Sequence, residues 1–422
     1  MHFITPSFTR FTPLFLVTLS ACSLSGSGSG FGATPGGVQD IGLARELAAS
    51  GLVPPAEAFV VEGMFSEHDL PLGGAPCPRT LCVAGAGGLA PGADGATAGW
   101  VQIGLSSRID PATFERPAQT LVLVVDVSGS MGWGNGEETP GEISRTLLSQ
   151  IAGELDPTDA VALVAYGSDV TVPLALGPAS NGMLERTIAG LREAGATNLE
   201  AGLQRGIEIA RSARAADASR AVRIMLFTDE QPNVGVTSPG AFGAMAADAA
   251  ESDIGITVFG AGRGLGQTVF VAMSHLRGGN AFSLFTQQDV PDLMEDSWPW
   301  MLVPIATDLV VRPTFETGLT VRRAHGFPAT EADEASTVFL SRRRGALLLE
   351  LGGTPEMLTG GNVTLDLSYL EPSGAPVEER LVITLPQEPG FSQVSVAHAA
   401  SLALLVEGMH EAAEQYLSLI HI

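Results

Sequence analysis

The middle of the chain is a series of short apolar runs separated by segments with helical periodicity. The runs are LVLVV (121–125), AVALVAY (160–166), IMLF (224–227) and ITVF (256–259). Runs that are apolar at nearly every position are typical of strands buried on both faces, as in a parallel sheet. Between them apolar residues recur at helical spacing, for example at Ile143, Leu147, Leu148 and Ile151. This alternation predicts a doubly wound, Rossmann-like α/β domain with a parallel-sheet core over residues 118–298.

The apolar period becomes two in the C-terminal part of the chain. NVTLDLSY (362–369) and RLVITL (380–385) both alternate apolar and polar residues, and turn signals separate such runs. We expect an antiparallel β-sandwich of about six strands over residues 299–390. The Gly-rich segment 56–117 holds strand-like pieces, FVVEGMF (59–65) and GWVQIGL (99–105), without evident partners of their own. We expect them to pair with the C-terminal strands, so that the α/β domain is an insertion within the sandwich.

The N-terminus has the organisation of an export signal. A short region with one arginine precedes the apolar stretch FTPLFLVTLSA, which is too short to span a bilayer. The stretch ends in LSAC (19–22), which resembles the lipobox of bacterial lipoproteins, in which the cysteine is lipidated. Residues 1–21 are therefore expected to be a lipoprotein signal peptide, Cys22 a lipid anchor to the membrane, and 22–55 a flexible linker. This places the protein in the bacterial cell envelope; the alternative is a plain secretory signal with an incidental Cys22.

The C-terminal stretch SVAHAASLALLVEGMHEAAEQY reads as an amphipathic helix over residues 391–416 that stops abruptly. The last six letters, LSLIHI (417–422), match the translation of a common sequencing adapter. We expect them to be an artefact that truncates the helix near Tyr416, with a natural apolar C-terminus as the alternative.

The net charge of the chain narrows the class of partner, and two of its cysteines predict a covalent link. The net charge is −24, and all 22 basic residues are arginine. Nucleic acid is excluded as a partner because phosphate binding requires a basic face. Cys77 and Cys82, in CPRTLC, are predicted to form a disulfide in an oxidising compartment, with a free pair as the alternative.

Three strand-end loops of the α/β domain carry oxygen ligands. The first is DVSGSM with Asp126, Ser128 and Ser130, the second GATNLEAGL with Thr197, and the third LFTDEQPNVG with Asp229. Ligands bind at the carboxyl ends of the strands in doubly wound sheets, so these loops are expected to share one crevice. Hydroxyl and carboxylate oxygens suit Mg²⁺, Mn²⁺ or Ca²⁺ rather than zinc. Taken singly, the serines and the threonine also fit turn or helix-cap roles.

This set of loops resembles the metal-ion-dependent adhesion site of von Willebrand factor type A domains, known as MIDAS. The resemblance covers about residues 118–298 and fills all five motif positions in order. It implies that Ser128, Ser130 and Thr197 bind the metal directly, whereas Asp126 and Asp229 act through water and by orienting the hydroxyls. Neutral hydroxyl ligands leave the ion its positive character, so that an Asp or Glu of a partner protein completes its coordination. The chain is thus expected to be a metal-dependent binding or adhesion module and not an enzyme.

One position departs from the family pattern, and two alternatives stay open. Glu230 stands where the family has glycine after the second aspartate, and a third carboxylate there would strengthen metal binding while weakening attraction to an acidic partner. In the first alternative the chain is a metal-independent envelope scaffold. In the second it is a metal-assisted hydrolase, against which the sparse histidines argue, since Ser128 or Ser130 would lack a base. Trp133 and the acidic loop with Glu137 and Glu138 are expected either to border the site or to be a solvated surface.

Overall fold

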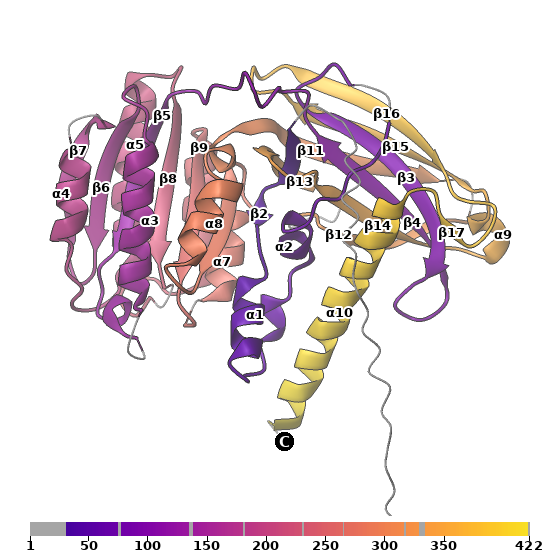
Figure 1. Cartoon of the computed structure of the whole chain (residues 1–422), viewed down its shortest axis with the longest axis horizontal. Coiled ribbons are helices and arrows are strands. Elements are labelled where there is room, and N and C mark those ends of the chain that lie inside the picture. Colours follow the sequence, from indigo (N-terminus) through magenta and orange to yellow (C-terminus); the bar gives the residue numbers. More distant parts are fainter. Residues whose placement is uncertain are drawn as a thin grey trace, which may run out of the picture.

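The computed structural model describes residues 31–74, 77–134, 138–179, 182–229, 232–264, 266–315, 318–328 and 334–420. Its strands form two sheets that lie side by side (Figure 1). One sheet is seven-stranded and mostly parallel, and the other is ten-stranded and antiparallel. The mixed α/β class and the large antiparallel partner sheet expected from the hydrophobic pattern are both present.

The seven-stranded sheet has the order β2-β10-β9-β8-β5-β6-β7, in which only β7 is antiparallel to its neighbour. Its strands are β2 (Gly37–Val38), β5 (Gln119–Asp126), β6 (Ala160–Tyr166), β7 (Val170–Pro178), β8 (Ala221–Thr228), β9 (Ile254–Ala261) and β10 (Gly279–Leu284). All eight residues of the central strand β5 are buried. This explains the uniformly apolar run, because each face of the strand packs on a separate core.

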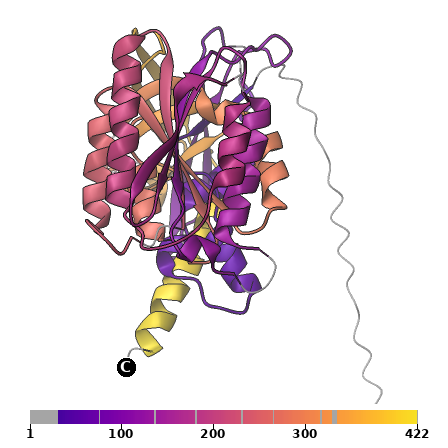
Figure 2. The same ribbon diagram turned by 90° about the vertical axis from the view of Figure 1, so that its left-hand side faces the viewer.

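Helices cover both faces of this sheet (Figure 2). Leu121 and Leu123 share one core with α3 (Pro140–Glu154), α4 (Met183–Gly190) and α8 (Asp289–Asp296). Val122 and Val124 point the opposite way and share another core. The helices of that second face are α1 (Gly42–Ala49), α5 (Leu199–Ala216), α6 (Pro239–Ala250) and α7 (Gln267–Ser274). This is the doubly wound arrangement.

The ten-stranded sheet has the order β12-β14-β4-β1-β13-β11-β15-β16, and β3 pairs with both β4 and β17. Its strands are β1 (Gly32–Pro35), β3 (Cys82–Pro91), β4 (Thr97–Ser106), β11 (Pro304–Phe315), β12 (Thr320–His325), β13 (Glu334–Ser341), β14 (Ala346–Gly352), β15 (Asn362–Leu370), β16 (Pro376–Thr384) and β17 (Gly390–Phe391). Residues of β3, β4 and β14 share one apolar core with residues of β11, β15 and β16. The sheet therefore folds over on itself like a sandwich.

The expected pairing of the N-terminal segment with the C-terminal strands is present. β4 lies beside β14, with Leu347 opposite Ile103, and β1 lies beside β13. The strands β5 to β10 thus fall, in sequence, between two strands of the antiparallel sheet. The remaining helical segments are the short η1 (Ala56–Ala58), α2 (Val61–Ser66), η2 (Ser130–Gly132), η4 (Trp300–Leu302) and α9 (Pro355–Leu358), and the long helix α10 (Val394–Ile420).

Two expectations for the N-terminal region are wrong. The described part of the expected linker, residues 31–55, contains β1, β2 and α1, and Phe31 to Val38 are all buried. The piece FVVEGMF is not a strand, because α2 begins at Val61. Burial of Met64 against Val406, and of Phe65 against Trp100, outweighs the β-propensity of its valines. Among the helices of the described residues, none is long and apolar enough to cross a membrane.

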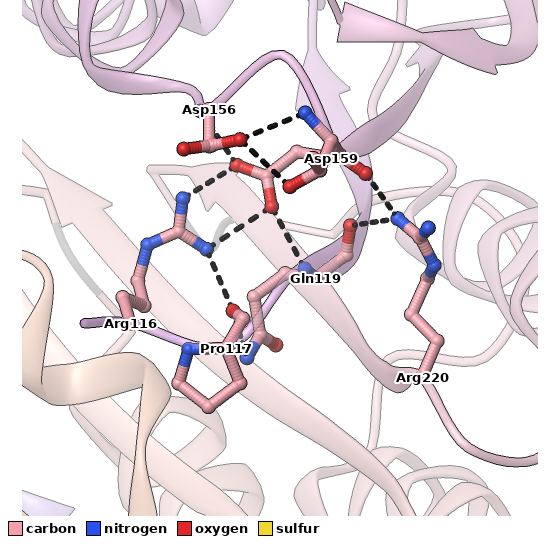
Figure 3. Close-up of polar contacts among 7 residues, drawn as sticks. Arg116, Pro117, Gln119, Asp156, Asp159 and Arg220 are labelled. Carbon is pink, nitrogen blue, oxygen red and sulfur yellow. Dashed lines mark hydrogen bonds and ion pairs between the residues drawn. The ribbon is translucent and has the colours of Figure 1, made fainter.

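A polar cluster fixes the chain where it enters the α/β domain, at the end of the sheet opposite the loops that follow β5 and β8 (Figure 3). The fully buried Asp159 carboxylate accepts hydrogen bonds from the Arg116 guanidinium at 3.1 Å, the Gln119 N–H at 2.7 Å and the Asp156 N–H at 2.8 Å. The Arg116 guanidinium also lies 5.9 Å from the ring centre of Trp298, where the chain leaves the domain. Asp159 and Arg116 therefore tie the incoming chain to β6 and to the outgoing chain.

Replacement of Asp159 by alanine should lower the free energy of unfolding by about 3 kcal/mol, because it leaves a buried guanidinium and two N–H groups without their acceptor. Urea unfolding followed by circular dichroism measures this loss. Asp248→Ala, which breaks an exposed ion pair with Arg211, is the control and should cost less than about 1 kcal/mol. Equal effects of the two substitutions would contradict the assigned role of Asp159.

Candidate functional site

The three loops expected to share a crevice lie at the carboxyl edge of the seven-stranded sheet. Asp126 is the last residue of β5, and Asp229 follows the last residue of β8, its parallel neighbour. From β5 the chain continues to β6 on one side of the strand, while β8 lies on the other. Such a reversal of strand order opens a crevice at the strand ends.

Asp126 organises the first loop. One carboxylate oxygen accepts the Ser128 N–H at 2.8 Å, and the other accepts the Thr228 hydroxyl at 3.1 Å. The Ser128 and Ser130 Oγ atoms lie 3.0 Å apart. Neither serine caps a helix, since α3 is capped by Thr139 and η2 has no side-chain cap. The helix-cap alternative for these two hydroxyls is therefore not what the structure contains.

The second loop holds Thr197 in a buried position. Asn198, and not Thr197, caps α5 by accepting the Ala201 N–H at 3.1 Å. Thr197 is 1% exposed, and its N–H donates to Asn233 Oδ1 at 3.0 Å. The Asn233 amide in turn donates to the Thr197 hydroxyl at 3.5 Å, so Asn233 orients this residue from the third loop.

Backbone contacts lock the second loop to the first. The Gly129 N–H donates to the Gly195 carbonyl at 3.0 Å, and the Ala194 N–H donates to the Val127 carbonyl at 2.8 Å. Gly195 has a φ of +83°, and a Cβ there would lie 2.3 Å from Ser168 Oγ. Glycine is therefore required at this position to bring Thr197 beside the serine loop.

A cavity of about 870 Å³ opens at this edge, and both Ser130 and Asp229 line it. Its other walls come from the turn after β9, with Gly262, Arg263 and Gly264, and from the segment after β10, with Phe285, Thr286 and Gln288. Trp133 lines its mouth and is 74% exposed. The Arg263 guanidinium lies there too, paired with Glu46 at 2.6 Å. We refer to this space as the strand-end cavity.

Burial dominates the electrostatics of the site. Burial raises the pKa of Asp126 to about 6; hydrogen bonds from Ser128 lower it, and the negative charge of Asp229 raises it further. Tyr166, the last residue of β6, is fully buried, and burial followed by the charge of Asp126 raises the pKa of its phenol well above the usual value. Two buried carboxylates thus share a small volume, which is costly unless a cation balances them.

The donor set fits a small, hard divalent cation. The site offers hydroxyls of Ser128, Ser130 and Thr197 together with carboxylates of Asp126 and Asp229, and all of these are oxygen ligands. Adjacent ligands of an octahedral ion with bonds of about 2.1 Å are about 3.0 Å apart. The two serine Oγ atoms are hydrogen-bonded to each other at 3.0 Å, so they already lie as close together as two ligands of one such ion would.

Four residues that surround or orient the candidate ligands were not identified from the sequence. Asn233, Thr228 and Tyr166 orient or surround the expected ligands, and Arg263 brings a positive charge to the cavity. Asn233 was detectable in principle, because it lies in the same loop as Asp229. Arg263 belongs to the glycine-rich turn after β9, which carried no recognisable motif of its own.

The structure describes some, but not all, of the other features expected from the sequence. Cys77 and Cys82 form a disulfide. Glu138 and Trp133 line the cavity, whereas Glu137, Glu230 and Cys22 lie outside the described residues. Among the described residues that line the cavity there is no histidine to act as a base for either serine.

The α/β domain is doubly wound and has a site rich in hydroxyls and carboxylates where its strand order reverses. This combination is typical of a class of ligand-binding domains. Residues 121–231 match the family described as von Willebrand factor type A domain. The chain therefore contains a von Willebrand factor type A domain, a family of protein-interaction and adhesion modules.

Individual relatives cover only parts of the chain. It is 26% identical over 208 residues to the uncharacterized protein YfbK of Escherichia coli, covering 49% of this chain and 35% of that protein. It is 28% identical over 206 residues to inter-alpha-trypsin inhibitor heavy chain H1 of Mesocricetus auratus, covering 47% of this chain and 22% of that protein. The chain thus spans well under half the length of either relative. Among solved structures, a von Willebrand factor type A protein from Catenulispora acidiphila is similar at 13% identity and a TM-score of 0.46, over 74% of each chain.

Substitution of Asp126 by asparagine should stabilise the metal-free protein at pH 7.5 by about 1–2 kcal/mol. The folded pKa of about 6 lies above the ordinary aspartate pKa of 3.8. The stability contributed by this carboxyl is therefore complete below pH 3.8 and is lost as the pH rises through 6. The gain should therefore vanish near pH 4.

Urea unfolding in EDTA at the two pH values measures this difference, with the exposed Asp169→Asn as the control. A variant that is less stable than the parent at pH 7.5 would show that the hydrogen bonds to Asp126 outweigh the cost of burying its charge.

Proposed function

We propose that the α/β domain binds a divalent cation, Mg²⁺ or else Mn²⁺ or Ca²⁺, and uses it to bind a carboxylate of a partner protein. The observation that carries this proposal is that three hydroxyls, of Ser128, Ser130 and Thr197, are held at one edge by their neighbours without capping any helix. Asp126 and Asp229 are buried at the same edge. A structural role in caps or turns does not account for this combination.

Each residue has a distinct part in the proposed site. The hydroxyl oxygens of Ser128, Ser130 and Thr197 are the direct ligands, and Asn233 keeps the Thr197 hydroxyl in place. Asp126 fixes the serine loop through the Ser128 N–H, and with Asp229 supplies the negative charge that retains the ion. When bound, the cation supplies positive charge that attracts an anionic group.

The cavity suits a protein side chain rather than a reaction. Its mouth presents the exposed Trp133 ring, a residue type that is enriched at protein interfaces. Its described lining contains no histidine, which supports binding over hydrolysis. We infer that the chain is not an enzyme and that the partner presents Asp or Glu.

Mg²⁺ should bind the purified protein and raise its melting temperature, because an ion that binds only the folded state stabilises that state. Asp126→Ala and Thr197→Ala should each weaken binding at least about tenfold, a loss of about 1.4 kcal/mol, measured by calorimetric titration. Thr187→Ala, on the half-buried side of α4 and outside the cavity lining, and the exposed Asp248→Ala are matched controls that should leave binding unchanged. Absence of binding of Mg²⁺, Mn²⁺ and Ca²⁺ to the parent protein would overturn the proposal.

The carboxylate requirement is tested on the captured partner. Proteins retained from envelope extracts in Mg²⁺, and released by EDTA, are compared between the parent and Asp126→Ala. The proposal requires that one partner is lost in Asp126→Ala and is also lost when a single Asp or Glu of that partner becomes its amide. Retention of the partner in EDTA would support the metal-independent scaffold instead.

We propose further that the protein is attached to the cell-envelope membrane through lipid on Cys22, with residues 1–21 removed. The motif LSAC at the end of a short apolar core supports this. Cys22→Ser should move the protein from the detergent phase to the aqueous phase of a Triton X-114 separation. The double variant Cys77→Ser, Cys82→Ser keeps Cys22 and should stay in the detergent phase; aqueous partitioning of the parent protein would contradict the anchor.

A further inference from the structure

A second cluster of metal-ligand side chains lies in the antiparallel sheet, away from the strand-end cavity. His325 ends β12, Glu350 lies on the adjacent strand β14, and Glu407 lies on α10. Glu350 is opposite Arg323 in the register of these antiparallel strands. Because side chains two residues apart share a face of a strand, Glu350 and His325 are on the same face of the sheet.

Helix α10 packs across this face and brings the third group. Ala399, Ala400 and Ala403 lie in one apolar cluster with Trp100 of β4 and Leu348 of β14. Glu407 follows Ala403 by one helical turn and so points to the same side of α10. The C-terminal half of α10 then extends away from both sheets (Figure 1).

The three groups are close enough to share one ion. One ligand atom from each of His325, Glu350 and Glu407 lies within 4.8 Å of the other two. His325 Nδ1 is 3.4 Å from Glu407 Oε1. His325 is 3% exposed and Glu350 is 2% exposed, so a ligand here would be largely shielded from water.

Two buried polar atoms of the cluster have no hydrogen-bond partner among the described residues. They are Glu350 Oε2 and His325 Nε2. Glu350 Oε2 faces the cluster, 3.6 Å from the Arg323 guanidinium, which is beyond hydrogen-bond distance. Burying a carboxylate oxygen without a hydrogen-bond partner is energetically costly. Such an atom indicates a position for a ligand that the protein's own atoms do not supply.

The imidazole is held in place by packing. Its ring stacks on Trp100, with ring centres 6.1 Å apart and an interplanar angle of 27°. Its Nδ1 lies 3.4 Å from Glu407 Oε1, and its Nε2 has no hydrogen-bond partner among the described residues. The ring is therefore fixed beside the two carboxylates, and its Nε2 is not occupied by another polar group of the described residues.

The Arg323 guanidinium would compete with a metal ion for the space between the Glu350 and Glu407 carboxylates. The guanidinium lies 3.0 Å from Glu407 Oε2 and 3.6 Å from Glu350 Oε2, where it partly balances the two carboxylates. The Arg323 side chain is 47% exposed, so it can turn into solvent at small cost. A guanidinium and a metal ion cannot both lie between these carboxylates, because like charges repel at that distance.

We propose that His325, Glu350 and Glu407 form a zinc-type site that fastens α10 to the antiparallel sheet, with Arg323 leaving when the metal binds. One imidazole nitrogen and two carboxylates are a donor set for Zn²⁺, and water completes the coordination. The site differs in chemistry from the strand-end cavity, whose donors are all oxygen. It is independent of the proposed partner binding.

Co²⁺ is the probe, because its visible absorption reports four- or five-coordinate sites and Zn²⁺ displaces it. The full chain carrying Asp126→Ala, which removes the strand-end site, should bind one Co²⁺ and release it to Zn²⁺. Arg323→Gln in that background should bind at least tenfold more tightly, since it removes the competing charge and leaves every ligand in place. Arg380→Gln, which breaks an exposed ion pair with Asp366 elsewhere in the same sheet, is the matched control and should change nothing.

His325→Gln and Glu350→Gln should each abolish the absorption band, with folding checked by circular dichroism. Arg323→Gln keeps the proposal testable even if those variants fail to fold. Absence of Co²⁺ and Zn²⁺ binding in Arg323→Gln would overturn the proposal and leave Arg323 as the resident cation. Persistence of the band in folded His325→Gln would equally overturn it.

Discussion

Burial of β5 on both faces is the constraint on which the α/β domain depends. Leu121, Leu123 and Val125 enter one helical layer, and Val122 and Val124 enter the other. The strand therefore cannot slide by one residue without exchanging the two sets. That register fixes Asp126 at the end of the strand, beside the carboxyl ends of β6 and β8. The strand-end cavity is thus a consequence of packing that occurs several residues away from it.

The two sheets are joined at more than one place, which makes the inserted domain part of a single framework. β1 belongs to the antiparallel sheet and β2, two residues later, to the parallel one. The crossing occurs at Gly36 and Gly37, where Gly37 has a φ of +82° and a Cβ on Gly36 would lie 2.5 Å from the Gly279 carbonyl. Arg116, Asp159 and Trp298 hold the incoming and outgoing chain near the far end of the same domain.

Both candidate ion sites contain carboxylates whose negative charge must be balanced, but the groups around those carboxylates differ. At the strand-end cavity, Asp126 accepts hydrogen bonds from a backbone N–H and a hydroxyl, Asp229 is buried nearby, and a hard cation suits these oxygens. In the antiparallel sheet, Glu350 and Glu407 meet an imidazole and a mobile guanidinium, and these favour either a zinc-type ion or Arg323 itself. In each place, buried negative charge determines which cation is stable there.

The sequence by itself determined the alternation of strands and helices and the switch in apolar period near residue 305, and it named five candidate residues for the strand-end site. These are local patterns: an apolar run predicts a buried strand wherever it lies, and Asp126, Ser128 and Ser130 are adjacent in the chain. It also predicted that GWVQIGL would pair with a C-terminal strand, because this piece had no partner strand nearby. In the structure that strand is β14, beside β4.

Only the tertiary structure decided the features that depend on distant contacts. β1, β2 and α1 form in a stretch expected to be a linker because partners some 240 to 300 residues away bury them, Ala281 for Val38 and Leu340 for Ala33 among them. The FVVEGMF segment became helix α2 through burial against α10 and β4. Arg263 and the group of His325, Glu350 and Glu407 were likewise not identifiable from the sequence, since each carries out its role only beside residues that the fold brings to it.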